Sequence, residues 1–183
     1  MLQRYSVDIP TSETVGNYAR HLASLTASSW RLADEDITLL TWAARLHEIG
    51  IGISQKHYNR HSAYVIENSD MPGFSQGDQI VMSRLLRGHR GKLPPYLFDD
   101  IPSKKREKFA RMLVLLRLAV ILKHAGPTSI EPDFTARAKG EKLKVRFPDA
   151  WRRTHPLTLW EVSESKTAFE KLGVKVRITN EHP

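Results

Sequence analysis

The sequence has no cysteine and no long uninterrupted apolar run. Without cysteine there are neither disulfides nor thiolate metal sites, which is typical of a reducing compartment. The longest apolar run, 112–122, is interrupted by Arg117 and is too short to span a bilayer. The first ten residues also lack the basic and then apolar pattern of a secretory signal. The sequence therefore predicts a cytoplasmic protein that does not associate with membranes.

Several common catalytic signatures are missing as well. There is no G-x-x-x-x-G-K-[ST] phosphate loop and no G-x-S-x-G nucleophile turn, and the Gly-x-Gly at 50–52 is not continued as a dinucleotide-binding motif. The four tryptophans are dispersed, which is typical of packing residues and not of a base-stacking surface. Any chemistry must therefore come from histidines, carboxylates and cations.

Helical spacing of apolar residues dominates the first part of the chain. It predicts helices beginning near residues 11, 34, 58, 76 and 103, the last of them a buried helix that runs to about 124. Beyond residue 130, alternation predicts strands over 134–138, 143–147, 157–162 and 174–178, with a helix over 164–172. We therefore expect an α+β fold: a mainly α-helical bundle over 1–129 followed by a small β-β-β-α-β domain over 130–183.

Positive charge is concentrated in the middle of the chain. The net charge is +8, and residues 84–124 alone carry 11 Lys/Arg against 3 Asp/Glu. Such a segment favours a polyanionic ligand, which could be nucleic acid, polyphosphate or a highly phosphorylated nucleotide. The alternative is that Lys104, Lys105, Arg106 and Lys108 merely solvate the start of a helix.

Histidines stand at the ends of the predicted helices, where a helical metal-dependent (HD-type) phosphohydrolase would hold a divalent cation. The candidate ligands are His47, Glu48, His61 and His89. Glu48 is longer than the usual aspartate, and Val120 stands where a further carboxylate would be expected. The alternative is that these histidines bond to the backbone.

Cations lie close in sequence to the same histidines. Guanidinium groups bind phosphate oxygens in bidentate fashion, so the predicted phosphate-binding residues are Arg60, His61, Arg87, His89, Arg90 and Lys92. The alternative is that Arg60 pairs with Glu67 or Asp70, and Arg84 or Arg87 with nearby carboxylates, as ordinary surface ion pairs.

Four segments together resemble the C-terminal region of the exopolyphosphatase/guanosine pentaphosphate phosphohydrolase (Ppx/GppA) family. They are 46–50, 60–65, 68–74 and 116–120, and 146–151 is similar to that family's small terminal domain. The resemblance implies an HD-like helical domain without a complete metal set. It also implies that hydrolysis belongs to an N-terminal pair of actin-like subdomains, which nothing in this sequence resembles.

The resemblance thus favours a binding and dimerisation module that is not hydrolytic by itself. Its ligand would be inorganic polyphosphate or guanosine pentaphosphate (pppGpp), with no cofactor in this chain and a homodimer in the full-length protein. The second hypothesis is a metal-dependent HD-type phosphohydrolase. The third, nucleic-acid binding through 84–124, ranks last because no groove-reading motif accompanies the charge.

Overall fold

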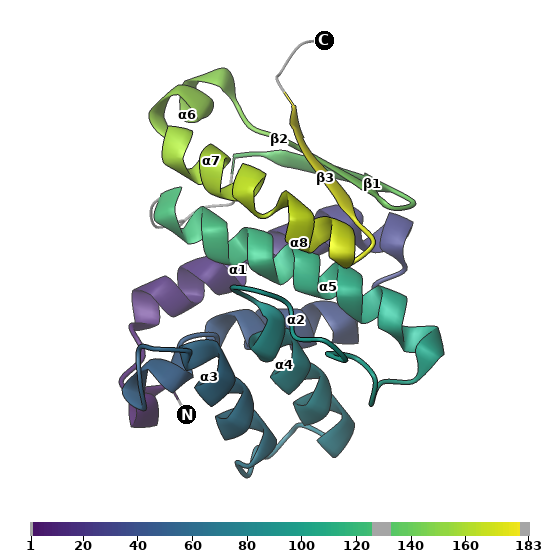
Figure 1. Ribbon diagram of the computed structural model, residues 1–183. Helices are drawn as coiled ribbons and strands as arrows, with labels where there is room; N and C mark the ends of the chain where they lie inside the picture. Colours follow the sequence, from purple (N-terminus) through teal and green to yellow (C-terminus); the bar gives the residue numbers. More distant parts are fainter. Residues whose placement is uncertain (1, 126–132, 180–183) are drawn as a thin grey trace.

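A computed structural model describes residues 2–125 and 133–179 (Figure 1). These residues form eight α-helices and one three-stranded sheet, so the predicted mainly helical α+β class is confirmed. The helices are α1 (Ile9–Trp30), α2 (Asp34–Arg45), α3 (Tyr58–Glu67), α4 (Gln76–Gly88), α5 (Ser103–Leu122), α6 (Asp149–Thr154), α7 (Pro156–Glu164) and α8 (Lys166–Lys171), and the strands are β1 (Thr135–Lys139), β2 (Lys142–Arg146) and β3 (Lys175–Thr179).

Side-chain caps fix where two of the helices begin. At α1 the cap is Asp8, whose carboxylate accepts from the Thr11 backbone N–H at 3.0 Å, so the cap lies upstream of the position expected from the sequence. At α4, which begins where the sequence predicts, Ser75 and Asp78 form a capping box, each side chain accepting from the other's backbone N–H. The second of these caps sets the register of α4, whose last turn carries Arg87.

Helix α5 is the centre of the molecule. It contacts α1, α2, α4 and α7, and residues 112–119 are all buried. In Figure 1 it runs between α3 and α4 on one side and the sheet with α7 and α8 on the other. Each fully buried leucine or valine stabilises such a core by about 1.5–3 kcal/mol. The predicted central helix is confirmed.

The sheet lies against α1 on the other side of the bundle from α3 and α4 (Figure 1). Strand β1 pairs antiparallel with β2 through a turn at Gly140, and β2 pairs parallel with β3. Trp30 at the end of α1 donates its indole N–H to the Gly140 carbonyl at 3.0 Å. Buried residues of the sheet and of the bundle thereby join in one hydrophobic core.

The third predicted strand is wrong. Residues 157–162 lie in α7, so the order after residue 133 is β-β-α-α-α-β and not β-β-β-α-β. Buried Thr158 and Val162 are four residues apart, which is helical spacing, whereas Leu157 and Trp160 are exposed. Pro156 also favours a helix, because its fixed φ suits a first helical residue.

The predicted domain boundary between 129 and 130 lies among residues 126–132, outside the described residues, and stays a prediction. Within 2–125 and 133–179, no helix has both the length and the hydropathy that a membrane span requires.

Candidate functional site

The turn that follows α2 is fixed against α3 by one buried hydroxyl. Ser62 donates to the His47 carbonyl and accepts from the Gly50 N–H, both at 2.9 Å. Gly50 is needed there because a Cβ would collide with the backbone of Tyr58 and Ser62. The sequence His47-Glu48-x-Gly50 therefore locks the end of α2 onto the first turns of α3.

A lysine ammonium lies between the first two predicted metal ligands. Lys123, directly after α5, places Nζ 2.5 Å from Glu48 Oε1 and 3.5 Å from His47 Nε2. His47 is fully buried, and its Nδ1 donates to the Ala44 carbonyl at 2.8 Å. Hydrogen bonding with His47 lowers the pKa of Glu48 to about 2, and hydrogen bonding with Lys123 contributes to the same shift. Burial opposes it. The Glu48 carboxylate is thus ionised and already paired with a cation.

His89, the C-cap of α4, is buried beside this cluster. Its Nδ1 donates to the Leu86 carbonyl at 2.7 Å, and its ring lies edge-on to His47 with 5.6 Å between centroids. Burial, with His47 nearby, lowers the pKa of His89 well below its ordinary value, so the ring is neutral. Its Nε2 has no hydrogen-bond partner among the described residues.

The predicted metal ligands are only partly brought together. His47, Glu48 and His89 cluster, whereas His61 lies half-buried on α3 and forms no hydrogen bond, ion pair or ring contact with these three residues. Among residues 2–125 and 133–179, no three His, Asp or Glu side chains are placed to hold a metal ion. The donor set does not fit a metal as it stands, because the Lys123 ammonium takes the Glu48 oxygen.

Four of the six predicted phosphate-binding residues line one cavity of about 570 Å³. We call it the cationic pocket. It lies between the first turn of α3, the last turn of α4 and the loop that follows, and its lining residues are His57, Asn59, Arg60, Arg87, Arg90, Gly91, Lys92, Leu93, Pro94 and Pro95. The predicted residues His61 and His89 do not line it. A volume of this size is typical of small-molecule sites.

The charges of this pocket are not neutralised within the described residues. None of its lining residues is a carboxylate, and within 2–125 and 133–179 no ion pair is formed by Arg60, Arg87, Arg90 or Lys92. Partial desolvation and the nearby Arg60 lower the pKa of Arg87, and the same effects lower that of His57. The cations therefore repel one another, which an incoming anion would relieve.

One side of the pocket is a helix C-terminus, whose free carbonyls would repel an anion. Here those carbonyls are bound internally. Asn59 Nδ2 donates to the Arg87 carbonyl at 2.9 Å, and Arg117 donates to the Gly88 and Gly91 carbonyls at 2.7 and 2.8 Å. The loop after α4 thus lines the cavity with the cations Arg90 and Lys92, while its Gly88 and Gly91 carbonyls are bonded to Arg117.

Four residues that line or support this site were not predicted from the sequence. His57 adopts a left-handed conformation (φ 60°) immediately before α3, and no sequence signal marks it. Asn59 and Arg117 act through backbone carbonyls, which a sequence pattern does not show. Lys123 could have been found, because it lies three residues after Val120 and therefore on the same face of the extended helix.

The basic run at the start of α5 has partners of its own. Lys108 pairs with Asp36 at 2.7 Å, and Arg106 donates to the carbonyls of Ile101 and Asp99. These two cations hold the helix start to the rest of the bundle. The charge of 84–124 is thus shared among cations bonded within the fold, cations that line the cationic pocket, and the exposed residues Lys104 and Lys105.

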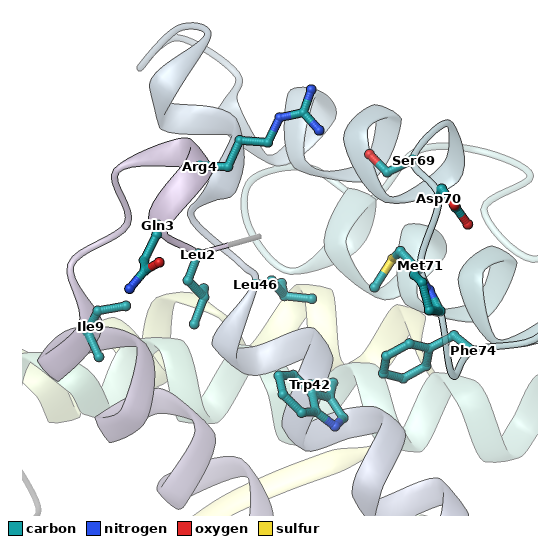
Figure 2. Close-up of a pocket in the computed structure, with 11 residues that line it drawn as sticks. Leu2, Gln3, Arg4, Ile9, Trp42, Leu46, Ser69, Asp70, Met71 and Phe74 are labelled. Carbon is teal, nitrogen blue, oxygen red and sulfur yellow. The ribbon is translucent and has the colours of Figure 1, made fainter.

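A second cavity, of about 580 Å³, is mostly apolar (Figure 2). Trp42 and Phe74 lie edge to face on its wall with 6.1 Å between ring centroids, next to Leu46 and Met71. Arg4 and Asp70 are the charged residues that line it. Such a wall does not suit a polyanion.

Comparison with known proteins gives a consistent result. The family described as Ppx/GppA phosphatase, domain III, matches residues 1–166. A protein of Pseudoalteromonas translucida named guanosine-5'-triphosphate,3'-diphosphate pyrophosphatase is 36% identical over 177 residues, which cover 96% of this chain and 35% of that protein. Proteins of the same name from Aliivibrio fischeri and Vibrio vulnificus are 33% and 35% identical, each covering 87% of this chain and 32% of the relative. The chain thus spans about a third of the length of these relatives.

Proposed function

Because the chain belongs to the Ppx/GppA phosphatase family, as its domain III, we propose that it binds the phosphate groups of inorganic polyphosphate or guanosine pentaphosphate and does not hydrolyse them by itself. The resemblance read from the sequence is confirmed by the family match over residues 1–166. The observation that carries the proposal is the cationic pocket, in which Arg60, Arg87, Arg90 and Lys92 line one cavity without a carboxylate.

The pocket has the chemistry of a phosphate site. Three guanidinium groups offer paired N–H donors that fit phosphate oxygens, and the lysine adds a mobile point charge. Arg90 also stacks over the Tyr58 ring at 4.5 Å, which orients its guanidinium without neutralising it. A chain of phosphates, with one or more charges on each unit, would satisfy several of these donors at once.

We expect hydrolysis to belong to the part of the full-length relatives that this chain does not cover. In this chain the half-buried carboxylate of Glu48 is already paired with Lys123. The metal-dependent alternative requires stoichiometric divalent metal and loss of activity in His47→Ala. Metal content of the purified chain, measured by mass spectrometry, tests that alternative directly. Homodimerisation of the full-length protein and a cytoplasmic location stay predictions from the sequence.

Calorimetric titration with inorganic tripolyphosphate tests the proposed function. Removing one charged hydrogen-bond donor costs about 1.5–3 kcal/mol, so Arg60→Ala and Arg90→Ala are each expected to weaken binding about 10- to 100-fold. The matched control is Arg137→Ala, which removes the same charge from an exposed position on β1. Equal affinities in all four proteins, or no binding by the parent chain, would contradict the proposal.

A further inference from the structure

A groove of about 490 Å³ continues from the cationic pocket and has a different chemistry. The two cavities share Arg60, Arg87, Pro94 and Pro95. Beyond these shared residues the groove is lined by two tyrosines, three carboxylates and Arg84, together with Ala63, Ser83 and Leu97. A ligand that places phosphates in the pocket can therefore extend into the groove without leaving the protein surface.

Two aromatic rings stand exposed in this groove. Tyr64 on α3 is 65% exposed, and Tyr96 in the loop after Pro95 is 80% exposed. Tyr96 also has a positive φ of 61°, an unfavourable conformation for a bulky residue. Exposed aromatic rings beside a cationic site are the usual platform on which nucleobases stack.

The carboxylates of the groove keep acceptor capacity. Arg84 bridges Glu67 and Asp100, and Ser83 donates to the same Glu67 oxygen, Oε2, at 2.8 Å. The other Glu67 oxygen has only a 3.5 Å contact to Arg84. Asp99 is largely exposed, and its ion pair with Arg106 is long, at 3.7 Å. Oxygens of Glu67 and Asp99 can therefore accept bonds from a ligand.

We propose that this groove binds the guanine base of a nucleotide whose phosphates occupy the cationic pocket, with Tyr96 stacking on the ring and Asp99 or Glu67 accepting from its N–H edge. The inference rests on the proposed function. Guanine presents two adjacent donors, N1–H and the 2-amino group, which match a carboxylate. Adenine presents one donor next to an acceptor nitrogen, which a carboxylate repels.

The test compares three ligands that share a triphosphate: GTP, ATP and inorganic tripolyphosphate, titrated calorimetrically into the chain in magnesium-free buffer. Stacking of one base contributes enough for GTP to bind about tenfold more tightly than tripolyphosphate. Tyr96→Ala should remove that gain and leave tripolyphosphate affinity unchanged, whereas Tyr96→Phe should keep it. The double variant Asp99→Asn with Glu67→Gln should abolish the preference for GTP over ATP, and the single variants show which carboxylate accepts.

The outcomes separate the two proposals. If tripolyphosphate binds and GTP and ATP bind no better, or if the double carboxylate variant keeps its preference for GTP, the guanine groove is overturned and the phosphate pocket stands. If tripolyphosphate does not bind but GTP binds in a Tyr96-dependent way, the groove is supported and the phosphate pocket is overturned. If none of the three binds, both are overturned.

Discussion

Arg117 shapes the cationic pocket without lining it. It lies in α5 with only 5% of its surface exposed, and its guanidinium holds the carbonyls of Gly88 and Gly91. Replacing it by methionine, which has a similar length, removes this hold while every cation that lines the pocket stays in place.

The expected effect of Arg117→Met on stability is small. Burial lowers the pKa of Arg117 from 12.5 to about 10, which corresponds to roughly 3 kcal/mol of desolvation at about 1.4 kcal/mol per pH unit. Methionine removes that cost but leaves the buried Gly88 carbonyl without a donor, at about 1–3 kcal/mol, and the more exposed Gly91 carbonyl without one at a smaller cost. Because these effects nearly cancel, we expect the free energy of unfolding to fall by only about 1 kcal/mol.

The expected effect on binding is larger than the effect on folding. Without Arg117 the loop at 88–91 is free to take other conformations, so Arg90 and Lys92 must be ordered when the anion binds. We expect tripolyphosphate affinity to fall about tenfold. Arg117→Lys should also lose affinity, because one ammonium cannot span both carbonyls as the guanidinium fork does.

Urea denaturation gives the stability of each variant, and calorimetry gives its affinity for tripolyphosphate. A variant that loses 3 kcal/mol or more of stability would show that the buried charge is not costly. A variant that binds tripolyphosphate like the parent chain would show that the loop keeps its shape without Arg117, and the reasoning would be refuted.

Three further predictions concern the junction of α2, α3 and α4. Lys123→Met leaves the buried Glu48 charge without its cation, so the free energy of unfolding measured in urea should fall by about 3–5 kcal/mol. The pKa of His89 lies below that of an unfolded histidine, so below pH 6.5 the unfolded state binds more protons and stability falls, by up to about 1.4 kcal/mol per pH unit in urea series between pH 7 and 5. Gly50→Ala should destabilise by more than about 3 kcal/mol and Gly88→Ala by about 1–2 kcal/mol, because the first added Cβ meets backbone atoms and the second meets leucine side chains.

Each of these has its own control. A second substitution, Glu48→Gln, should recover much of the stability lost in Lys123→Met, and failure to do so would show that the ion pair is not the cause. His89→Asn keeps a donor in place of the ring Nδ1 but cannot titrate, so an unchanged pH slope in that variant would contradict the assignment. Equal losses in the two glycine variants would show that the close approach at Gly50 relaxes easily.

Local signals predicted most of the helical bundle. The Ser75 and Asp78 capping box, and the nearly all-round apolar pattern of the last long helix, correspond directly to the start of α4 and to buried α5. The error at 157–162 arose because Leu157 and Leu159 alternate with polar neighbours as a strand would. In the fold, packing of α7 on α5 selects the helix, and alternation over so few residues does not report such a tertiary contact.

The candidate site was predictable only where side-chain type decides the chemistry. Clustering of Arg60, Arg87, Arg90 and Lys92 follows from their positions at helix ends that meet. The histidines were harder to assign, because a ring that bonds to a carbonyl three residues earlier, as His89 does, looks in sequence like a ligand. The meeting of both tyrosine-bearing segments also depends on how α3 packs on α4, which is a non-local property.

The cation between His47 and Glu48 is a side chain of the polypeptide itself. A metal at that place would have to be acquired, could be removed by a chelator, and would make folding depend on metal supply. An encoded ammonium is present in every copy as soon as the chain is synthesised. The junction that positions α3 and α4 is therefore complete on folding, whatever the metal concentration of its surroundings.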